Sequence, residues 1–357
     1  MLKISPQVRH GQEVAVIPDW VQKQTETFLR PPEGAQITQE SLSGMWLIHD
    51  YEMKDLHYAS QIESRKNALL AQEYDIVPGG TRLVDRKARD FAQWVFGNMD
   101  HTIHNVFDSA LDAISKGFSL AELVWDPVTE GEWVGKIRLR AVKDKDQRYF
   151  RFKFDPYGNL DPDIGIQQVN EYGYPTTNKM RPDKFLIYVF SRRRDNWYGE
   201  GLGTKCAWYI FFKKAGIRWW NIHLQKFGNP TVIGKYPAGA NGAKVDEFLS
   251  AMKSLTEQSA IAFPNGTEGN EFILELLEAT RGGEGGFKGF IDYIDACISK
   301  RILGGQLVTD PGTRGARSMG ALHQFNRMAL AKFDALTLQD AINEQLLKRL
   351  TKINFPG

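Results

Sequence analysis

The stretch WWNIHLQKFGNPTVIGKYPAG, from Trp219 to Gly239, changes character in its middle. Its first half is apolar and aromatic, and it continues a helix-forming run that begins near Thr204. Gly228-Asn229-Pro230 ends that run, because proline lacks a backbone donor and restricts the residue before it. The segment TVIGKYP that follows is rich in residues that favour strands. The sequence therefore predicts a long apolar helix that leads directly into a small strand.

A small α/β unit is expected after this helix, from about 229 to 279. The strand TVIGKYP is followed by a helical run, KVDEFLSAMKSLTEQ, and by two strand-like runs, SAIAFP and EFILELLE. A second helix is expected in FKGFIDYIDACISKRIL, whose apolar residues recur at helical spacing. They are Phe287, Phe290, Ile291, Ile294, Ile298 and Ile302. Since the first helix has about 24 residues, it would span about 36 Å.

The rest of the chain combines helical and strand patterns. A helix is expected to run into a short strand before Gly79-Gly80, and 85–96 is amphipathic. One helix face from Ile103 to Ile114 ends at Gly117, a favourable C-cap, before the strand FSLAELVW. Further strands are expected in KIRLRAV, RYFRFKF and KFLIYVF. A last helix begins near Met319, with apolar Leu322, Phe325, Phe333, Leu336, Ile342, Leu346 and Leu350. The fold class is α+β.

Composition limits the classes of function. The chain has 357 residues, of which 42% are hydrophobic and 25% are charged, and its 45 Lys and Arg against 43 Asp and Glu leave a formal charge of +2. Proteins that grip DNA tightly usually carry a basic excess, because each phosphate contact is electrostatic. This chain is therefore expected to ignore nucleic acid or to touch it without holding it. Cys206 and Cys297 predict no disulfide framework, and no apolar run reaches the roughly 18 residues of a membrane span.

Motifs for catalysis, cofactors and metals are largely missing. GEGLGTK at 199–205 lacks the Walker spacing, so we interpret it as a lead-in with Thr204 as the N-cap of the long helix. His101 and His104 are expected three residues apart on one helix, as two metal ligands could be. No third ligand is visible at a supporting spacing, so no metal site is predicted.

Two clusters admit more than one interpretation. Arg192–Arg194 favours a solvated face or intersubunit salt bridges, with a phosphate contact as the alternative. Trp208, Trp219 and Trp220 could form a base-stacking platform. Aromatic residues at helical spacing are more often packing residues, here against a neighbouring subunit.

The order of these segments resembles the portal proteins of tailed bacteriophages, specifically the Mu-type portal family. The similarity lies in ALDAISKGFSLAELVW, in YGEGLGTKCAWYIFFKKAGIRWWNIHLQKFGNPTVIGKYP, in IDACISKRILGGQLVTDPGTRGARSMGALHQ and in the final INEQLLKRLTKINFP. It runs from about Arg65 onward, and it lies in the order and spacing of the motifs rather than in any single one. Members commonly continue past Asn-Phe-Pro, whereas this sequence stops at Gly357, so a short or absent crown is expected.

The resemblance implies a portal fold with an α/β wing, a two-helix stem, a small α/β clip and a short or missing helical crown. Its expected segments are an N-terminal arm (1–35), the first part of the wing (36–202), a stem helix (203–228), the clip (229–285), the second stem helix (286–303), a tunnel loop and wing helix (304–335), and a C-terminal helix leading to any crown (336–357).

The implied function is that of a head–tail connector. A ring of usually twelve copies would sit at one capsid vertex of the virion, after assembly in the host cytoplasm, and would pass double-stranded DNA during packaging and ejection. Its partners would be the terminase large subunit, neck or adaptor proteins, and the major capsid protein or scaffold, with no membrane and no cofactor. If the second stem helix lines the channel, Asp292 and Asp295 would repel phosphate.

Candidate residues follow from this mapping. DNA-channel or tunnel-loop candidates are Thr309, Asp310, Arg314, Arg317, Lys300 and Arg301. Gly228, Asn229 and Pro230 mark the junction of clip and stem, and the subunit-packing candidates are Trp208, Trp219, Trp220 and Phe227. No catalytic residue is expected. The alternatives are another phage head or tail scaffold protein, and an enzyme acting on nucleic acid through Arg192–Arg194 and the loop at 199–205.

Overall fold

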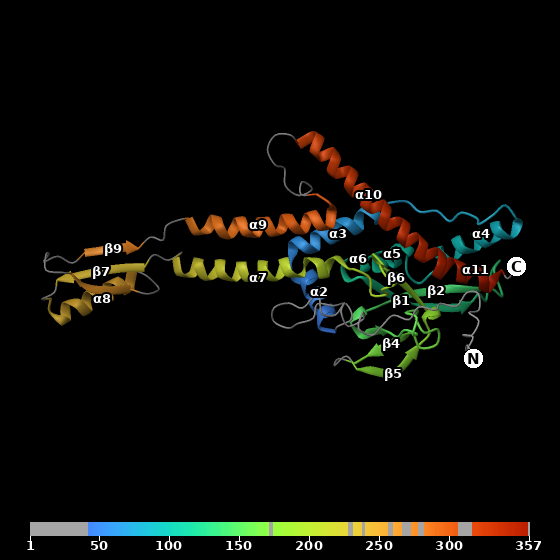
Figure 1. Cartoon of the computed structure of the whole chain (residues 1–357), viewed down its shortest axis with the longest axis horizontal. Coiled ribbons are helices and arrows are strands. Elements are labelled where there is room, and N and C mark those ends of the chain that lie inside the picture. Colours follow the sequence, from blue (N-terminus) through green and yellow to red (C-terminus); the bar gives the residue numbers. More distant parts are fainter. Residues whose placement is uncertain are drawn as a thin grey trace, which may run out of the picture. The chain divides into compact units, whose positions relative to one another are not determined.

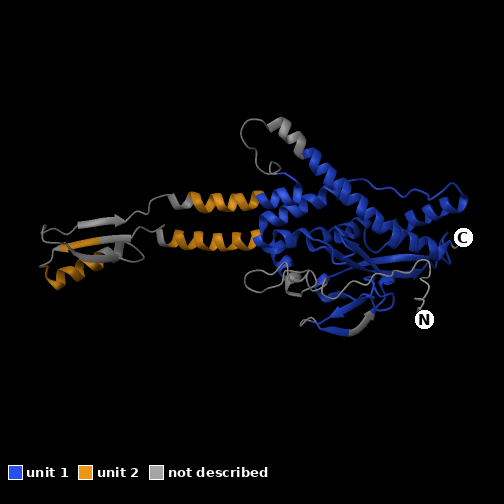
Figure 2. Cartoon of the chain, in the orientation of Figure 1, with its two compact units in different colours: residues 1–208, 297–357 blue, residues 209–296 orange. Residues whose placement is uncertain are grey.

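The computed structural model describes residues 42–170, 174–227, 231–237, 240–255, 260–265, 273–277, 282–305 and 316–355. The chain divides into two compact units, shown in Figure 2. Unit 1 comprises residues 1–208 and 297–357, and unit 2 comprises residues 209–296. Unit 2 therefore lies within the segment for which the sequence predicts two long helices around a small α/β unit. Among the described residues, no helix is long and apolar enough to cross a membrane.

Unit 1 begins with a group of helices: α2 (Leu42–Lys54), α3 (Leu56–Leu70), α4 (Leu83–Gly97), α5 (Ile103–Leu111) and α6 (Ala113–Lys116). Asp55 separates α2 from α3, because its Oδ1 accepts a hydrogen bond from Tyr58 N (2.8 Å) and so caps the new helix. The expected helix face from Ile103 to Ile114 is present but is divided at Asp112. Gly117 ends α6 with φ of 98°, which confirms the predicted C-cap.

Two three-stranded antiparallel sheets complete unit 1. One has the order β2-β1-β6, from β1 (Phe118–Pro127), β2 (Ile137–Lys145) and β6 (Phe185–Val189). The other has the order β3-β4-β5, from β3 (Phe150–Phe152), β4 (Ile166–Val169) and β5 (Pro175–Met180). Short 3₁₀ turns, η1 (Gln147–Tyr149) and η2 (Pro182–Lys184), precede β3 and β6. The strands predicted in KIRLRAV, RYFRFKF and KFLIYVF are thus confirmed.

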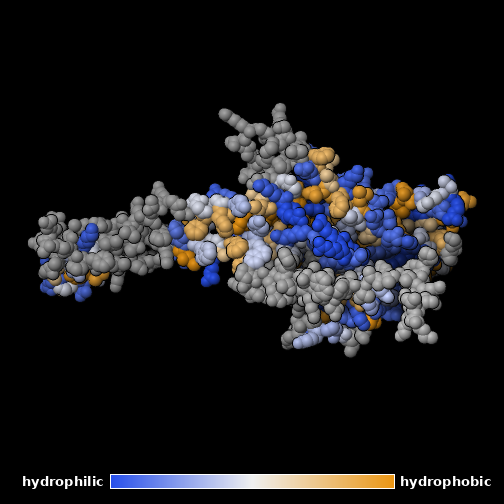
Figure 3. All heavy atoms as spheres, viewed as in Figure 1, coloured by the Kyte–Doolittle hydropathy of each residue, from blue (hydrophilic) through white to orange (hydrophobic). Residues whose placement is uncertain are grey.

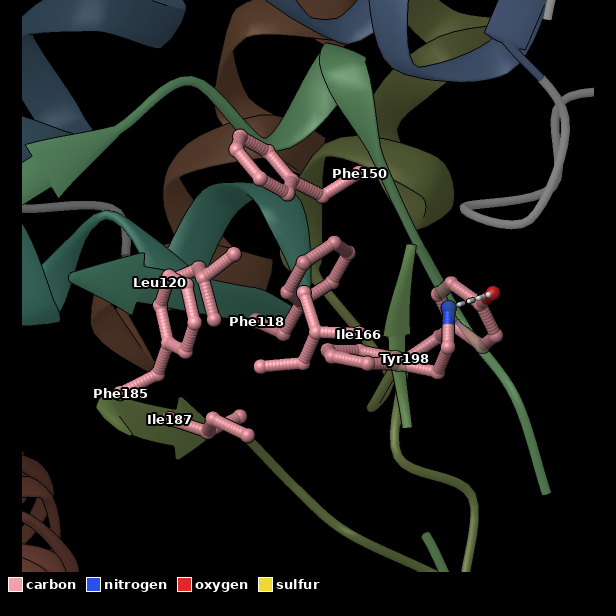
Figure 4. Packing of buried hydrophobic residues seen from close by; sticks show 8 residues of the cluster. Phe118, Leu120, Phe150, Ile166, Phe185, Ile187 and Tyr198 are labelled. Atoms are coloured by element: carbon pink, nitrogen blue, oxygen red, sulfur yellow. Dashed lines mark hydrogen bonds between the residues drawn. The ribbon is translucent and has the colours of Figure 1, made fainter. Parts of the chain in front are cut away.

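The apolar core of unit 1 joins the two sheets (Figure 4). The rings of Phe118 in β1 and Phe152 in β3 meet edge to face, with their centroids 4.9 Å apart. Tyr198 packs on both rings, and its hydroxyl accepts a hydrogen bond from Phe152 N (3.0 Å). The cluster consists of Phe118, Leu120, Phe150, Phe152, Ile166, Phe185, Ile187 and Tyr198. Tyr198 thereby fixes the segment after β6 to the core.

The short strand expected before Gly79-Gly80 is not formed. Residues 71–82 connect α3 to α4 without strand pairing. Ile76 N donates to the neighbouring Asp75 Oδ1 (2.7 Å), so an acidic side chain satisfies the backbone locally. The β-prone residues here have no partner strand beside them, and the prediction was wrong for that reason.

The C-terminal part of unit 1 is one continuous rod (Figure 1). It consists of α10 (Ala316–Ile342), a π-helical turn η3 (Asn343–Leu347) and α11 (Lys348–Asn354). Buried residues recur along it at every fourth position: Asp334, Leu338, Ile342, Leu346, Leu350 and Asn354. At its end, the Asn354 side chain pairs with the edge of β2, where it accepts from Ile137 N (2.7 Å) and donates to Ile137 O (2.8 Å). Phe355 packs against Phe91 of α4.

A buried ion pair joins α3 to this rod. Arg65 donates from Nε and Nη2 to the two carboxylate oxygens of Asp334 (2.7 and 3.0 Å). Its remaining nitrogen, Nη1, donates to Ile302 O (2.8 Å), and the guanidinium carbon lies 5.4 Å from the ring centroid of Phe190. The two side chains are only 6% and 1% exposed. A single arginine therefore ties four chain segments together.

Unit 2 contains most of two long helices and a small sheet. Residues 209–227 of α7 (Leu202–Phe227) and 282–296 of α9 (Gly282–Leu303) belong to it. The elements between them are β7 (Thr231–Pro237), α8 (Gly242–Leu255), β8 (Ala260–Asn265) and β9 (Ile273–Leu277). β7 lies between β8, with which it is parallel, and β9, with which it is antiparallel. The predicted order of strand, helix, strand and strand is confirmed, and both long helices begin slightly earlier than expected.

Candidate functional site

The helices α7 and α9 pair with each other inside unit 2. Lys213 Nζ lies 2.6 Å from Asp295 Oδ1, and the rings of His223 and Phe287 have centroids 5.5 Å apart. Between these contacts, a Cβ on Gly216 would lie 3.1 Å from the Phe290 ring. The contacts run forward along α7 and backward along α9, so the pair is antiparallel. Glycine at this position lets the ring approach closely, and any side chain here would require the ring to shift by a few tenths of an ångström.

Large apolar side chains remain exposed on both helices of this pair. In a single copy, they are 38–63% exposed, and hydrophobic residues gather on this part of the molecule in Figure 3. They are Tyr209, Phe211, Phe212, Ile217, Trp219, Ile222 and Leu224 on α7, with Phe290 and Tyr293 on α9. A patch of this density is typical of a protein–protein interface. We refer to these nine residues as the helix-pair patch.

The Lys213–Asp295 ion pair lies between the two helices. The side chain of Lys213 is 9% exposed and that of Asp295 is 23% exposed. Asp292 is exposed. The expectation that both aspartates would repel phosphate from a channel wall therefore has to be revised, since Asp295 is held by a lysine of the facing helix. This contact gives Lys213, in the middle of α7, a structural role.

A second feature is the connection from β6 to α7, which we call the basic turn (residues 191–200). Arg192 stacks on the Trp197 ring, with 3.9 Å from its guanidinium carbon to the ring centroid, and it pairs with Asp195 (3.3 Å). Ser191, Arg194 and Asp195 all adopt positive φ, at 51°, 53° and 53°. Left-handed backbone is unfavourable for residues with a side chain. The surrounding contacts must therefore hold the turn in place.

A third feature is a cluster of charges among the N-terminal helices. Lys116 is buried, and its Nζ lies 2.8 Å from Asp112 and 3.3 Å from Glu52. Lys66 Nζ contacts Asp112 and Asp108, at 2.7 Å each. Burial alone would raise the pKa of Asp112, but the ammonium groups of Lys116 and Lys66 more than offset it, and this pKa lies below its ordinary value. The charged form of Asp112 is therefore stabilised by folding.

Replacing Lys116 by Met should lower the free energy of unfolding by about 2 kcal/mol at neutral pH, because Asp112 and Glu52 lose a buried cation. The pKa of Asp112 is lower in the folded than in the unfolded protein. Its contribution to the free energy of unfolding is therefore complete above the unfolded-state pKa of about 3.9, and it is lost as the pH falls through the folded-state pKa. The gap between wild type and variant should thus shrink below about pH 4. Urea unfolding at a series of pH values measures it. Lys54→Met, which removes an exposed lysine paired with Asp50, should change stability little, and an equal loss there would contradict the interpretation.

The residues predicted for DNA contact fall in different places. Lys300 and Arg301 are exposed in the last turn of α9. Arg317 belongs to the first turn of α10. Thr309, Asp310 and Arg314 lie outside the described residues, as do Gly228, Asn229 and Pro230 of the expected junction.

The subunit-packing candidates are all on α7. Trp219 is 62% exposed, while Trp208 and Trp220 are half-buried. The indole nitrogen of Trp220 is buried and has no hydrogen-bond partner among the described residues. Phe227 is the last residue of the helix. Trp219 is therefore the tryptophan best placed to meet another molecule.

Two interpretations of small motifs were wrong. Thr204 is not an N-cap, because α7 begins at Leu202; its buried Oγ1 has no hydrogen-bond partner among the described residues. Lys205, in the supposed phosphate loop, pairs with Glu200 (2.8 Å). His101 and His104 do not share a helix, since α5 begins between them at Ile103. No cluster of three metal-binding side chains occurs in the described part of the chain.

Two solved structures share this fold. One is a chain of the virion of a native gene transfer agent particle, with a TM-score of 0.56 and 13% identity; the match covers 84% of this chain and 80% of that one. The other comes from the neck of an empty gene transfer agent particle, with a TM-score of 0.53 and 14% identity, and covers 94% and 84%. At this identity the likeness defines the fold alone. The fold therefore also occurs in chains of gene transfer agent particles.

The family is shown by sequence. A family model described as the portal protein of Mu bacteriophage matches residues 45–357, and the chain belongs to this family of phage structural proteins. The portal protein of Escherichia phage Mu is 26% identical over 351 residues, which cover 96% of this chain and 65% of that protein. The Mu-like prophage FluMu protein gp29 of Haemophilus influenzae is 26% identical over 334 residues, covering 91% and 61%. The chain thus spans somewhat less than two thirds of the length of these relatives.

Proposed function

We propose that this chain is the portal subunit of a tailed phage. Copies would associate side by side into a ring at a capsid vertex of the virion, around a channel through which double-stranded DNA is packaged and ejected. The observation that carries the proposal is the helix-pair patch, which leaves nine large apolar side chains to solvent in a single copy of a chain of the portal family.

Cyclic association gives these side chains a partner. In a closed ring, each copy contacts its two neighbours through two different faces. Every copy can therefore bury its apolar helix face, whereas an open row of copies would leave this face exposed at its end. The near-neutral charge of +2 also fits a channel protein, because DNA that must slide should not be held by many phosphate contacts. α7 and α9 would form the stem, and the sheet of β7, β8 and β9 with α8 would form the clip.

The proposal includes the partners of such a ring. Beside DNA and further copies of the chain, they are the terminase large subunit, neck or adaptor proteins, and the major capsid protein or a scaffold. The ring would act as a docking platform for these proteins. Lys300 and Arg301, exposed at the end of α9, are among the residues that we assign to DNA contact.

Particle size and shape test the proposal directly. Light scattering and negative-stain electron microscopy of the purified chain should show a large homo-oligomer with a central hole, and no ATPase activity should accompany it. Because some rings need a scaffold to assemble, the measurement is repeated with the scaffold protein present. Monomers or dimers alone at every salt concentration, in both settings, would contradict the function.

A separate prediction concerns the segment LVTDPGTRGARS at 307–318, which includes Thr309, Asp310 and Arg314. As a tunnel loop, it would contact DNA in the channel and contribute little to contacts between subunits. Shortening it should leave ring assembly intact and impair DNA packaging or retention, as measured by DNA content per particle. Loss of rings instead would show that the segment is architectural.

A further inference from the structure

The basic turn is the feature that ring formation leaves unexplained. Together with Lys205 at the start of α7, its arginines 192–194 supply four cationic side chains near Asp195 and Glu200. This local excess of two positive charges equals that of the whole chain, whose formal charge is +2. Four cationic side chains therefore stand against two carboxylates within residues 192–205.

The three arginines are not equivalent. Arg192 is engaged within the turn, since it stacks on Trp197 and pairs with Asp195. Arg193 and Arg194 are exposed, and neither forms an ion pair within the described part of the chain. The nearby carboxylate of Glu200 is bound by Lys205; that hydrogen bond, with a smaller contribution from Arg193 and Arg194, lowers the Glu200 pKa. Two adjacent guanidinium groups thus remain available to an outside anion.

The backbone presents these two groups in a fixed and strained arrangement. Ser191, Arg194 and Asp195 are the only non-glycine residues with positive φ in the described chain. A left-handed backbone is sterically unfavourable for residues with a Cβ. Both ends of the turn are held by backbone hydrogen bonds: Phe190 N donates to Gly117 O (2.7 Å), and Glu200 N donates to Phe190 O (3.0 Å). Strain held this firmly is typical of binding sites, and a merely solvated charged face would not require it.

We propose that the basic turn contacts the phosphate backbone of double-stranded DNA through Arg193 and Arg194. This deepens the proposed function, on which it rests. The guanidinium fork matches phosphate oxygens, and the closely spaced phosphates of a duplex offer it partners whatever the sequence. No large apolar side chain is exposed between 191 and 205, whereas protein interfaces have an apolar core, so the site fits a polyanion better than a protein partner.

The test uses the full chain, wild type and the double variant Arg193→Gln/Arg194→Gln. Binding of a short fluorescent DNA duplex is followed by anisotropy over a series of KCl concentrations, and ring formation is checked by microscopy. We expect about tenfold weaker binding at low salt. The slope of log affinity against log salt should become shallower by about one for each arginine that contacts phosphate.

The matched control is Arg86→Gln/Arg181→Gln, which removes two other exposed arginines of unit 1 and should leave affinity and slope unchanged. Equal DNA binding by wild type and the basic-turn variant would overturn the proposal. The proposal would also be overturned if Arg193→Gln/Arg194→Gln kept its affinity for DNA but lost its affinity for polyglutamate. The turn would then bind an acidic protein. The two proposals can be told apart. If the wild type forms no ring but the basic-turn variant still binds DNA more weakly, the portal function is contradicted while the DNA contact of the basic turn is supported.

Discussion

Arg65→Met should lower the free energy of unfolding by about 3–5 kcal/mol, because it leaves the Asp334 carboxylate buried without a cation. Asp334 is fully buried, and Arg65 is its only ion-pair partner among the described residues; the substitution also removes the donor to Ile302 O. Urea unfolding followed by far-UV circular dichroism measures the loss. We expect this to be among the most damaging substitutions in unit 1.

Two further variants separate the buried charge from the loss of packing. Arg65→Met/Asp334→Leu should recover much of the stability, because an apolar pair of similar volume needs no counter-ion. Arg327→Met removes another α10 arginine that reaches α3, where it donates to Ser64 O (3.1 Å) and Oγ (3.0 Å) from a half-exposed position. It should cost only about 1 kcal/mol. A loss as large as that of Arg65→Met would mean that contact between the helices, and not the buried carboxylate, dominates.

Trp219→Glu should prevent ring formation while leaving the single copy folded. Trp219 is 62% exposed in one copy, so a glutamate there meets no packing problem within the chain. In a ring, the substitution removes an aromatic anchor, worth about 2–4 kcal/mol at a well-packed interface, and places a charge in it at every contact. Sedimentation velocity should show monomers in place of rings, with an unchanged circular dichroism spectrum.

Gln225→Glu is the control for this substitution. Gln225 is also exposed on α7 within unit 2, and the change adds the same charge without removing an apolar side chain. Rings should persist. If Trp219→Glu assembled as the wild type does, the helix-pair patch would not be the contact between copies, and the structural basis of the proposed ring would have to be sought elsewhere.

Local signals predicted the elements of unit 2 well. Proline and glycine punctuate its sequence, and the spacing of apolar residues distinguishes α9 from the strands around it. Helix ends were less certain: the prediction placed the start of the first long helix near Thr204, whereas α7 begins at Leu202. A threonine after a glycine-rich run is a common N-cap, but here the preceding leucine is already helical and buried.

Contacts between distant parts of the chain had no sequence signal. Arg65 and Asp334 are 269 positions apart, and neither stands in a recognisable pattern. In the sequence, the terminal Asn-Phe-Pro stands out only through its resemblance to the portal family. The structure gives its first two residues a physical role, since Asn354 bonds the edge of β2 and Phe355 packs on α4.

The apolar pattern of the last helix also could not predict which of its side chains are buried within one copy of the chain. Among the apolar residues predicted for the last helix, Phe325, Phe333 and Leu336 are 68%, 53% and 51% exposed. Others of the same set, Ile342, Leu346 and Leu350, are buried. Periodicity measures which side chains share a face, and a face directed at solvent in one copy has the same periodicity as a face directed at the core.

The π turn in the C-terminal rod determines in which direction, around the helix axis, the side chains of α11 point. A step of four residues overshoots a full α-turn by about 40°, so the five steps from Asp334 to Asn354 would swing the buried face through about 200°. The extra residue of the π turn takes back about 100°. The remaining rotation of about 100° accompanies the change of partner from α3, at Asp334, to β2, at Asn354. The residue count between these two positions is therefore as constrained as their identity.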